Sequence, residues 1–153
     1  MTEHPTDIGA RRLSFADPRL WAVLLLSAIF LGLGGLFVLS PSAGAAIFGL
    51  PAPGGLADGY LRAIGVRDLA LALYLTGLAC FATRRAVSIV LGSSLLIPVC
   101  DIVIVWSSGT AALWQIALHL GSGAALMILT LWVSGTMHGS APARDGSGNS
   151  SEP

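Results

Sequence analysis

The sequence predicts an all-α protein, a membrane-embedded four-helix bundle. Its mean hydropathy is +0.80, and only 10% of its residues are charged, whereas soluble domains contain about 25%. Four apolar stretches have the roughly 20-residue length that a helix needs to cross a hydrocarbon core of about 30 Å. The repeated segments of alternating polarity that a membrane β-barrel requires are absent from the sequence. The predicted spans are 20–39, 60–82, 87–106 and 111–133.

The first span follows a polar segment, and we expect it to stay in the mature protein. Arg11 and Arg12 precede it, and the small residues at 43–45 would also suit a cleaved signal peptide. Signal-peptide cores contain only about 7–15 apolar residues, and the run at 20–39 is longer. We therefore interpret this run as a membrane span.

The connection from 41 to 59 contains a short apolar stretch, 45–50, that cannot cross a membrane. Prolines and glycines lie on both sides of it, and these residues are typical of turns. We interpret the stretch as a hydrophobic connector that rests on the outer leaflet. A lid across a pocket is the alternative.

Basic residues orient the second, third and fourth spans. The loops at 41–59 and 107–110 contain no basic residue, and cytoplasmic loops are enriched in arginine and lysine. The sequence therefore predicts a multi-pass protein of the cell membrane with cytoplasmic segments 1–19 and 136–153 around a membrane domain at 20–135. Both segments are polar, and we expect them to be disordered. The arginines outside the two outer loops and the spans are Arg11, Arg12, Arg19, Arg84, Arg85 and Arg144.

Polar side chains occur at a common depth in three of the spans. A rise of 1.5 Å per residue places them about 6–12 Å below the outer ends of their helices. Ionisable residues inside membrane spans are rare, and they usually mark functional sites. The sequence therefore predicts a ligand-binding layer in the outer half of the bundle, formed by Arg67, Asp68, Asp101, Gln115 and His119.

A proline in the third span is expected to shape this layer. Pro98 has no N–H group, so the carbonyl of Ser94 loses its usual helical donor. The resulting kink should open space beside Asp101.

The residue types in the layer also permit acid–base chemistry. A histidine beside a carboxylate can exchange protons near neutral pH, so Asp68, Asp101 and His119 are candidate catalytic residues. We expect Arg67 to reach towards Asp101, and Asp68 to face either His119 or Arg62. The pattern identifies no reaction, and whether the protein is an enzyme stays open.

The sequence argues against several other kinds of functional site. Cys80 and Cys100 lie at depths that differ by about 20 Å, too far apart for a disulfide. This separation argues against a dithiol oxidoreductase. His119 is the single histidine within the spans, so no metal or cofactor site is predicted. The chain also lacks a phosphate-binding loop and a basic stripe for nucleic acid.

Small residues in the spans indicate close helix packing. We expect them to pack the bundle internally, and a homodimer interface is the alternative. They are Ala28, Gly32, Gly34, Gly35, Gly92, Gly121, Gly123 and Ala125.

Pro41 with the Phe-Gly-Leu-Pro sequence at 48–51, the Gly-Val-Arg-Asp sequence at 65–68, Asp101 and the late His119 follow one another along the chain. In this order they resemble an uncharacterised family of small four-span membrane proteins, described only as a domain of unknown function, over about residues 20–133. The architecture also loosely resembles the DoxX-like four-helix membrane proteins, some of which are associated with quinone-linked oxidation. The resemblance implies the fold and implies that the polar layer is a family feature, but it transfers no reaction.

Three functions are compatible with these features. The first is the binding or processing of a lipophilic small molecule at the polar layer. The second is an accessory or structural subunit whose polar layer clamps helices, with a membrane protein or a second copy of the chain as partner. The third is a proton or small-solute transporter, although the inner half of the spans offers little more than the hydroxyls of Thr76, Ser88 and Thr130 as a polar path.

Overall fold

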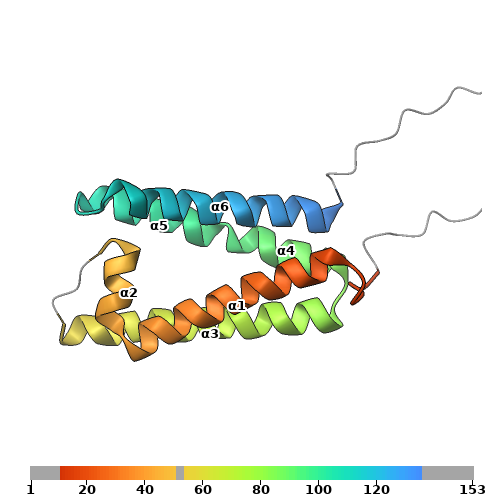
Figure 1. Cartoon of the computed structure of the whole chain (residues 1–153), viewed down its shortest axis with the longest axis horizontal. Coiled ribbons are helices and arrows are strands. Elements are labelled where there is room, and N and C mark those ends of the chain that lie inside the picture. The colour runs from red at the N-terminus through yellow and green to blue at the C-terminus, as the bar shows by residue number, and fades with distance from the viewer. Residues whose placement is uncertain (1–10, 51–53, 136–153) are drawn as a thin grey trace, which may run out of the picture.

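The computed structural model describes residues 11–50 and 54–135 of the chain, and these residues form helices and no strand. Four helical segments are long and apolar enough to cross a membrane: α1, α3, the α4–α5 segment and α6. The predicted all-α, four-helix membrane bundle is therefore confirmed (Figure 1). The expected disorder of 1–10 and 136–153 concerns residues outside the described part. The helices are α1 (Pro18–Leu39), α2 (Pro41–Phe48), α3 (Leu56–Phe81), α4 (Arg84–Ser94), α5 (Leu96–Ser108) and α6 (Leu113–Ser134).

Local sequence signals set several helix ends. The Asp17 carboxylate accepts a hydrogen bond from the N–H of Arg19 at the start of α1, and the Thr83 hydroxyl caps α4 in the same way. Gly109 and Gly135 end α5 and α6 with positive φ angles of 65° and 85°, a conformation that costs glycine little. These caps satisfy backbone groups that have no partner within their own helix.

The helices form two hairpins that meet at one end of the molecule and separate towards the other (Figure 1). One hairpin consists of α1 and α3, and the other of the α4–α5 segment and α6. We call the end that holds the start of α1 and the last turn of α6 the terminal end, and the opposite end the α2 end. The core lies towards the terminal end, where both hairpins bury Leu13, Leu20, Val23, Leu75, Ala79, Val87, Leu91, Leu126, Leu129 and Val133.

Within the first hairpin, α1 and α3 meet backbone to backbone at two glycines. A Cβ atom on Gly34 would lie 2.7 Å from the carbonyl oxygen of Gly65, and a Cβ on Gly65 would lie 2.7 Å from that of Gly34. Only a residue without a side chain permits this approach. The expected internal packing of small residues thus holds for Gly34. The same expectation is wrong for Gly32, Gly35 and Gly121, because a Cβ atom on any of them would have no neighbouring atom within 4 Å.

A polar contact also joins α1 and α3. The Ser27 hydroxyl lies 2.6 Å from the carbonyl oxygen of Ala72 and 2.7 Å from Oγ1 of Thr76. Ser27 is 4% exposed, so water does not compete for these bonds. The serine therefore contributes an interhelical hydrogen bond inside an apolar interface.

We expect the substitution Ser27→Ala to lower the free energy of unfolding by about 0.6–1.7 kcal/mol, the range measured for interhelical hydrogen bonds in membranes. Thermal unfolding of the purified protein in detergent measures this loss. Ser93→Ala is the matched control, because the Ser93 hydroxyl is exposed and bonds the carbonyl of Ile89 in its own helix. Equal losses in the two variants would contradict a stabilising role for the interhelical hydrogen bonds of Ser27.

The third span is broken at Leu95, between α4 and α5. Pro98 lies four residues after Ser94, and both residues are buried. The Ser94 carbonyl has no donor at position 98, and the chain turns at this point. The structure therefore shows an interruption of the third span where the proline predicts one.

Residues 11–17 pack against the terminal end, which corrects the expected disorder of 1–19 for this part. The N–H of Arg84 donates to the carbonyl of Arg11 at 2.9 Å, and Leu13 is buried in the core. Arg84 also reaches across to α6, where Nη2 donates to the carbonyl of Val133 at 3.1 Å. One apolar side chain, Leu13, and one backbone hydrogen bond, from Arg84 to Arg11, therefore hold a segment whose composition is polar.

Candidate functional site

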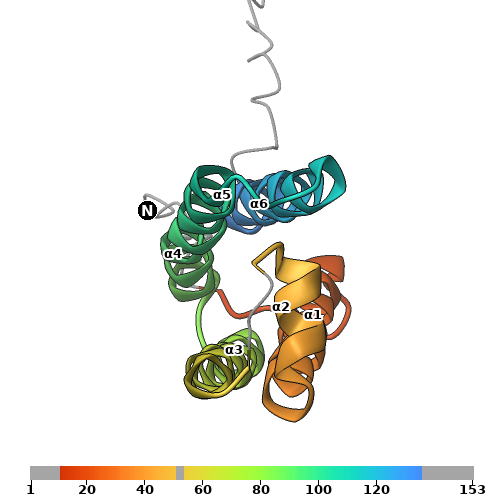
Figure 2. The same ribbon diagram turned by 90° about the vertical axis from the view of Figure 1, so that its left-hand side faces the viewer.

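The short helix α2 crosses the α2 end of the bundle, from α1 towards α6 (Figure 2). Pro41, Gly44 and Ala45 are buried, and the ring of Phe37 lies against Gly44 so closely that a Cβ there would be 2.7 Å away. A face of small residues thus lets α2 lie on the first hairpin. The stretch packs into the bundle and lines a cavity, in agreement with the alternative interpretation of a lid, whereas its position at the outer leaflet stays a prediction.

Side chains from the second hairpin hold the last turn of α2. The carbonyl of Ala45 accepts from the N–H groups of Gly49 and Leu50, but those of Ala46, Phe48 and Gly49 have no donor within the helix, and an unpaired carbonyl away from water costs free energy. Residues of α6 and of the loop before it supply the donors. The bonds are Gln115 Nε2 to Ala46 O at 2.6 Å, His119 Nε2 to Phe48 O at 2.9 Å, and Thr110 Oγ1 to Gly49 O at 3.2 Å.

Gln115 uses both ends of its amide for structure. Its oxygen accepts from the N–H of Ala112 at 2.7 Å, at the start of α6, and its nitrogen donates to Ala46. The residue is 8% exposed, and it is not among the residues that line the cavity described below. Gln115 therefore positions α2.

His119 both holds α2 and borders the cavity. A carbonyl oxygen only accepts hydrogen bonds, so Nε2 must carry a hydrogen in its bond to Phe48. The imidazole and the Phe48 ring meet edge to face, with centroids 4.8 Å apart and an interplanar angle of 72°. This geometry fixes the ring and leaves Nδ1 as the nitrogen that can accept a proton.

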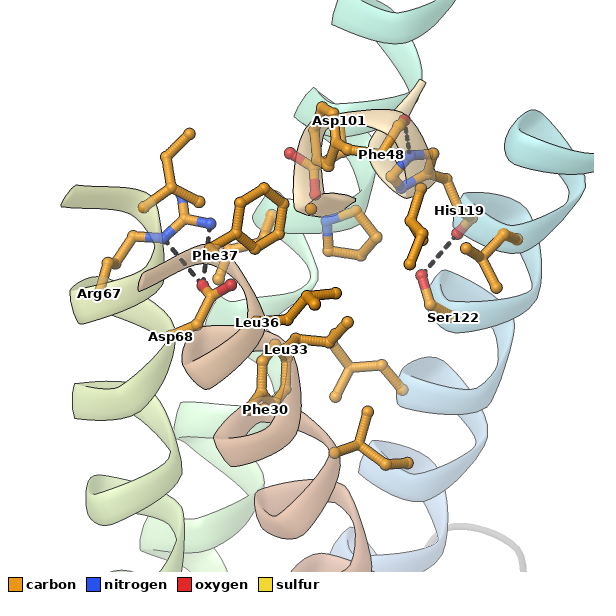
Figure 3. Close-up of a pocket in the computed structure, with 18 of the residues that line it drawn as sticks. Phe30, Leu33, Leu36, Phe37, Phe48, Arg67, Asp68, Asp101, His119 and Ser122 are labelled. Carbon is orange, nitrogen blue, oxygen red and sulfur yellow. Dashed lines mark hydrogen bonds and ion pairs between the residues drawn. The ribbon is translucent and has the colours of Figure 1, made fainter. Parts of the chain in front are cut away.

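A partly enclosed cavity of about 280 Å³ lies between the two hairpins, beneath α2. Its wall is mostly apolar, and the ionisable side chains of the predicted layer gather at its α2 end (Figure 3). The lining residues come from every helix except α4. They are Leu26, Ile29, Phe30, Leu33, Leu36, Phe37, Gly44, Ile47, Phe48, Ile64, Arg67, Asp68, Ile97, Pro98, Asp101, Leu118, His119, Ser122 and Leu126.

On one wall, Arg67 and Asp68 form an ion pair within α3. Arg67 Nη2 and Nε lie 3.0 and 3.2 Å from the same carboxylate oxygen, Oδ1 of Asp68. The Asp68 side chain is 8% exposed and that of Arg67 52% exposed. The expected reach of Arg67 towards Asp101 is therefore not seen, and Asp68 faces neither His119 nor Arg62. Because both partners lie on one helix, their bond does not join helices.

On the other side of the cavity, Asp101 projects from α5 (Figure 3). The ring of Phe37 lies between this carboxylate and the Arg67–Asp68 pair (Figure 3). Within the described residues, the Asp101 carboxylate makes no hydrogen bond or ion pair. Asp101 is thus the acidic group of the cavity without a direct partner.

The structure brings together four of the five predicted layer residues, namely Arg67, Asp68, Asp101 and His119, around one cavity. The apolar part of the wall was not predicted, and the contribution of α2 was considered only as the alternative interpretation of 45–50, a lid across a pocket. Phe37 and Phe48 are the main examples. The i to i+4 spacing of Gln115 and His119 predicted that they share a helix face. The backbone carbonyls that this face binds could not be predicted, because every residue type carries one.

No three histidine, cysteine, aspartate or glutamate side chains gather as a metal-binding group in the described ranges. Cys80 and Cys100 are both free thiols.

The sequence model of a domain of unknown function (DUF4267) matches residues 27–133. Neither a curated protein nor a solved structure gives a significant match. The match covers every span in whole or in large part, together with the cavity lining from Ile29 to Leu126. The chain is therefore a multi-pass membrane protein that belongs to the family defined by the domain of unknown function DUF4267.

Proposed function

We propose that the protein binds a lipophilic small molecule in the cavity between its two hairpins. One observation carries the proposal: a volume of about 280 Å³ has an apolar wall and a few ionisable side chains at one end. Small-molecule sites typically combine a concave apolar surface with a small number of placed polar groups. The volume is near the lower limit for such sites, so it suits one slender molecule.

The route of entry is proposed to be lateral, from the bilayer. Ile29 and Leu33 of α1 and Leu118 of α6 line the cavity and are 50%, 36% and 49% exposed. In a membrane, these apolar side chains would contact lipid tails. An opening of this kind favours a ligand that partitions into the membrane over a water-soluble one.

We further propose that the terminal end faces the cytoplasm and that the membrane is the cell membrane. Basic residues are enriched on the cytoplasmic side of membrane proteins. At the terminal end lie Arg11, Arg12, Arg19, Arg84 and Arg85. The polar end of the cavity would then lie in the outer half of the bilayer, with Asp68, Asp101 and His119 as candidates for acid–base chemistry on the ligand.

The test is a substitution that places a larger side chain inside the cavity. Ser122 lines the cavity, and its hydroxyl bonds the carbonyl of His119 in its own helix, so Ser122→Phe adds volume there without breaking a contact between helices. We expect the parent protein to copurify with about one lipophilic molecule per chain and Ser122→Phe to retain less than about a tenth of it. Mass spectrometry of organic extracts from the purified proteins measures both amounts.

Ser93→Phe is the control for this experiment. Ser93 is exposed on α4 and makes the same kind of bond within its helix, so its replacement adds an equal side chain outside the cavity. It should copurify with as much ligand as the parent. If the three proteins yield equal extracts, the cavity is not the binding site and the proposal fails.

A structural or accessory role is the second candidate. It draws support from Gln115 and His119, because these two members of the polar layer hold α2 to α6. Arg67 and Asp68 pair within one helix, and this weakens the idea of a clamp made by the whole layer. A conduction path is not proposed, because the apolar core around Leu20, Leu75 and Leu91 fills the bundle towards the terminal end.

A further inference from the structure

We propose that the ligand of the cavity is a single-chain cationic amphiphile, a long-chain amine whose ammonium group donates hydrogen bonds to the carboxylate of Asp101. This inference rests on the proposed function, because it names the chemical class of the molecule bound there.

The charges that border the cavity leave one carboxylate without a partner. Arg67 places two donors on Oδ1 of Asp68, and this pair is neutral as a unit. Asp101 has no hydrogen bond or ion pair among the described residues, and Phe37 stands between it and the pair (Figure 3). A carboxylate beside an apolar space is stabilised by a donor or a positive charge. A cationic head group supplies both.

In its neutral form, His119 does not supply this donor. Its Nε2 hydrogen is used in the 2.9 Å bond to the carbonyl of Phe48. In the neutral ring, Nδ1 is an acceptor and offers Asp101 no hydrogen. With His119 neutral, a molecule in the cavity is the remaining source of a donor for Asp101.

The remainder of the wall fits one apolar chain. From Phe37 to Leu26, the lining of α1 extends over about 16 Å at 1.5 Å per residue. The ionisable residues lie at the α2 end of this length, and Phe30, Leu33 and Leu126 line the rest. A volume of about 280 Å³ is small for a ligand site, and it favours a ligand with one chain over a two-chain lipid.

An anionic amphiphile would meet less favourable chemistry. Its head group could approach Arg67, but that guanidinium is already paired with Asp68 at 3.0 Å. It would also lie in a cavity that two carboxylates border. Like charges in a medium of low dielectric constant repel strongly, so the site should discriminate against a carboxylate head.

The experiment uses the full chain in nanodiscs of zwitterionic phosphatidylcholine. Radiolabelled dodecylamine retained by these nanodiscs, above that retained by protein-free nanodiscs, measures binding. Unlabelled dodecylamine, dodecanol and dodecanoate then compete for the site with identical tails. We expect dodecylamine to compete about tenfold more strongly than dodecanol, the ratio typical of one charge-assisted hydrogen bond, and dodecanoate to compete least.

Variants of the acidic residues locate the head group. Asp101→Asn should reduce the preference for amine over alcohol from about tenfold to less than about twofold. Asp58→Asn is the control, because it removes one carboxylate at the same end of the molecule outside the cavity lining. This variant should keep the preference of the parent.

Each outcome has a distinct meaning. Dodecanol competing as well as dodecylamine would overturn the amine assignment and leave the lipophilic site intact. Retention of no dodecyl compound above the protein-free level would overturn both proposals. The competition series on the parent protein decides the head-group chemistry even if Asp101→Asn does not fold.

Discussion

The double variant Gln115→Leu with His119→Phe is expected to release α2 from α6 and to lower the free energy of unfolding more than any other change considered. Both replacements keep the side-chain size, but they leave the carbonyls of Ala46 and Phe48 and the N–H of Ala112 without their partners. A backbone group left unpaired costs up to about 1–3 kcal/mol where no water replaces the lost partner. Thermal unfolding in detergent measures the total.

Hydrogen exchange separates local release of α2 from general loss of stability. In the double variant, the amides of α2 should exchange faster, while those of the core helices keep their protection relative to global unfolding. Thr130→Val is a suitable control on α6, since the Thr130 hydroxyl bonds the carbonyl of Leu126 in its own helix. Unchanged exchange in α2 would show that its packing on α1 and α3 holds it without the two side chains.

Gly34→Ala is expected to destabilise the first hairpin by about 1–3 kcal/mol, the usual cost of forcing extra volume into a packed interface. The new methyl group would lie 2.7 Å from the carbonyl oxygen of Gly65 and 2.9 Å from the backbone nitrogen of Leu69. Both neighbours are backbone atoms, so they can give way only if α1 and α3 move apart. The unfolding temperature in detergent measures this effect.

The neighbouring residue provides the control for this substitution. A Cβ on Gly35 would meet no atom within 4 Å, and alanine is the better helix former by about 1 kcal/mol. Gly35→Ala should therefore leave the stability unchanged or raise it. If both substitutions destabilise the protein equally, the close contact of Gly34 with α3 is not what limits stability.

The membrane fold could be predicted from the sequence because a bilayer strongly constrains which sequences can cross it. Each span needs about 20 apolar residues, and an interruption by a charge or a proline is conspicuous. The break in the third span could be predicted from Pro98, because the missing N–H of a proline disrupts the helix locally. The helical nature of residues 41–48 and the order of 11–17 were not predicted, because they depend on contacts with distant residues such as Phe37 and Arg84.

The candidate site was predictable as a set of residues, but its internal pairing was not. Ionisable residues are rare in apolar spans, so they are easy to recognise in the sequence. The rise per helical residue then predicts a similar depth for Asp101 and His119. Side-chain rotamers decide the rest. Arg67 folds back onto its neighbour Asp68 instead of reaching across the cavity, and His119 binds a backbone carbonyl that no residue type reveals.

The separation of the hairpins at the α2 end gives the molecule a wedge-shaped profile (Figure 1). The two hairpins meet around the core at the terminal end, and α2 lies between them at the other end. In a bilayer that its four spans cross, a molecule of this shape would displace more lipid area from one leaflet than from the other. Lateral pressure in the leaflet around the α2 end would then push the hairpins together, and the volume between them would depend on the surrounding lipids.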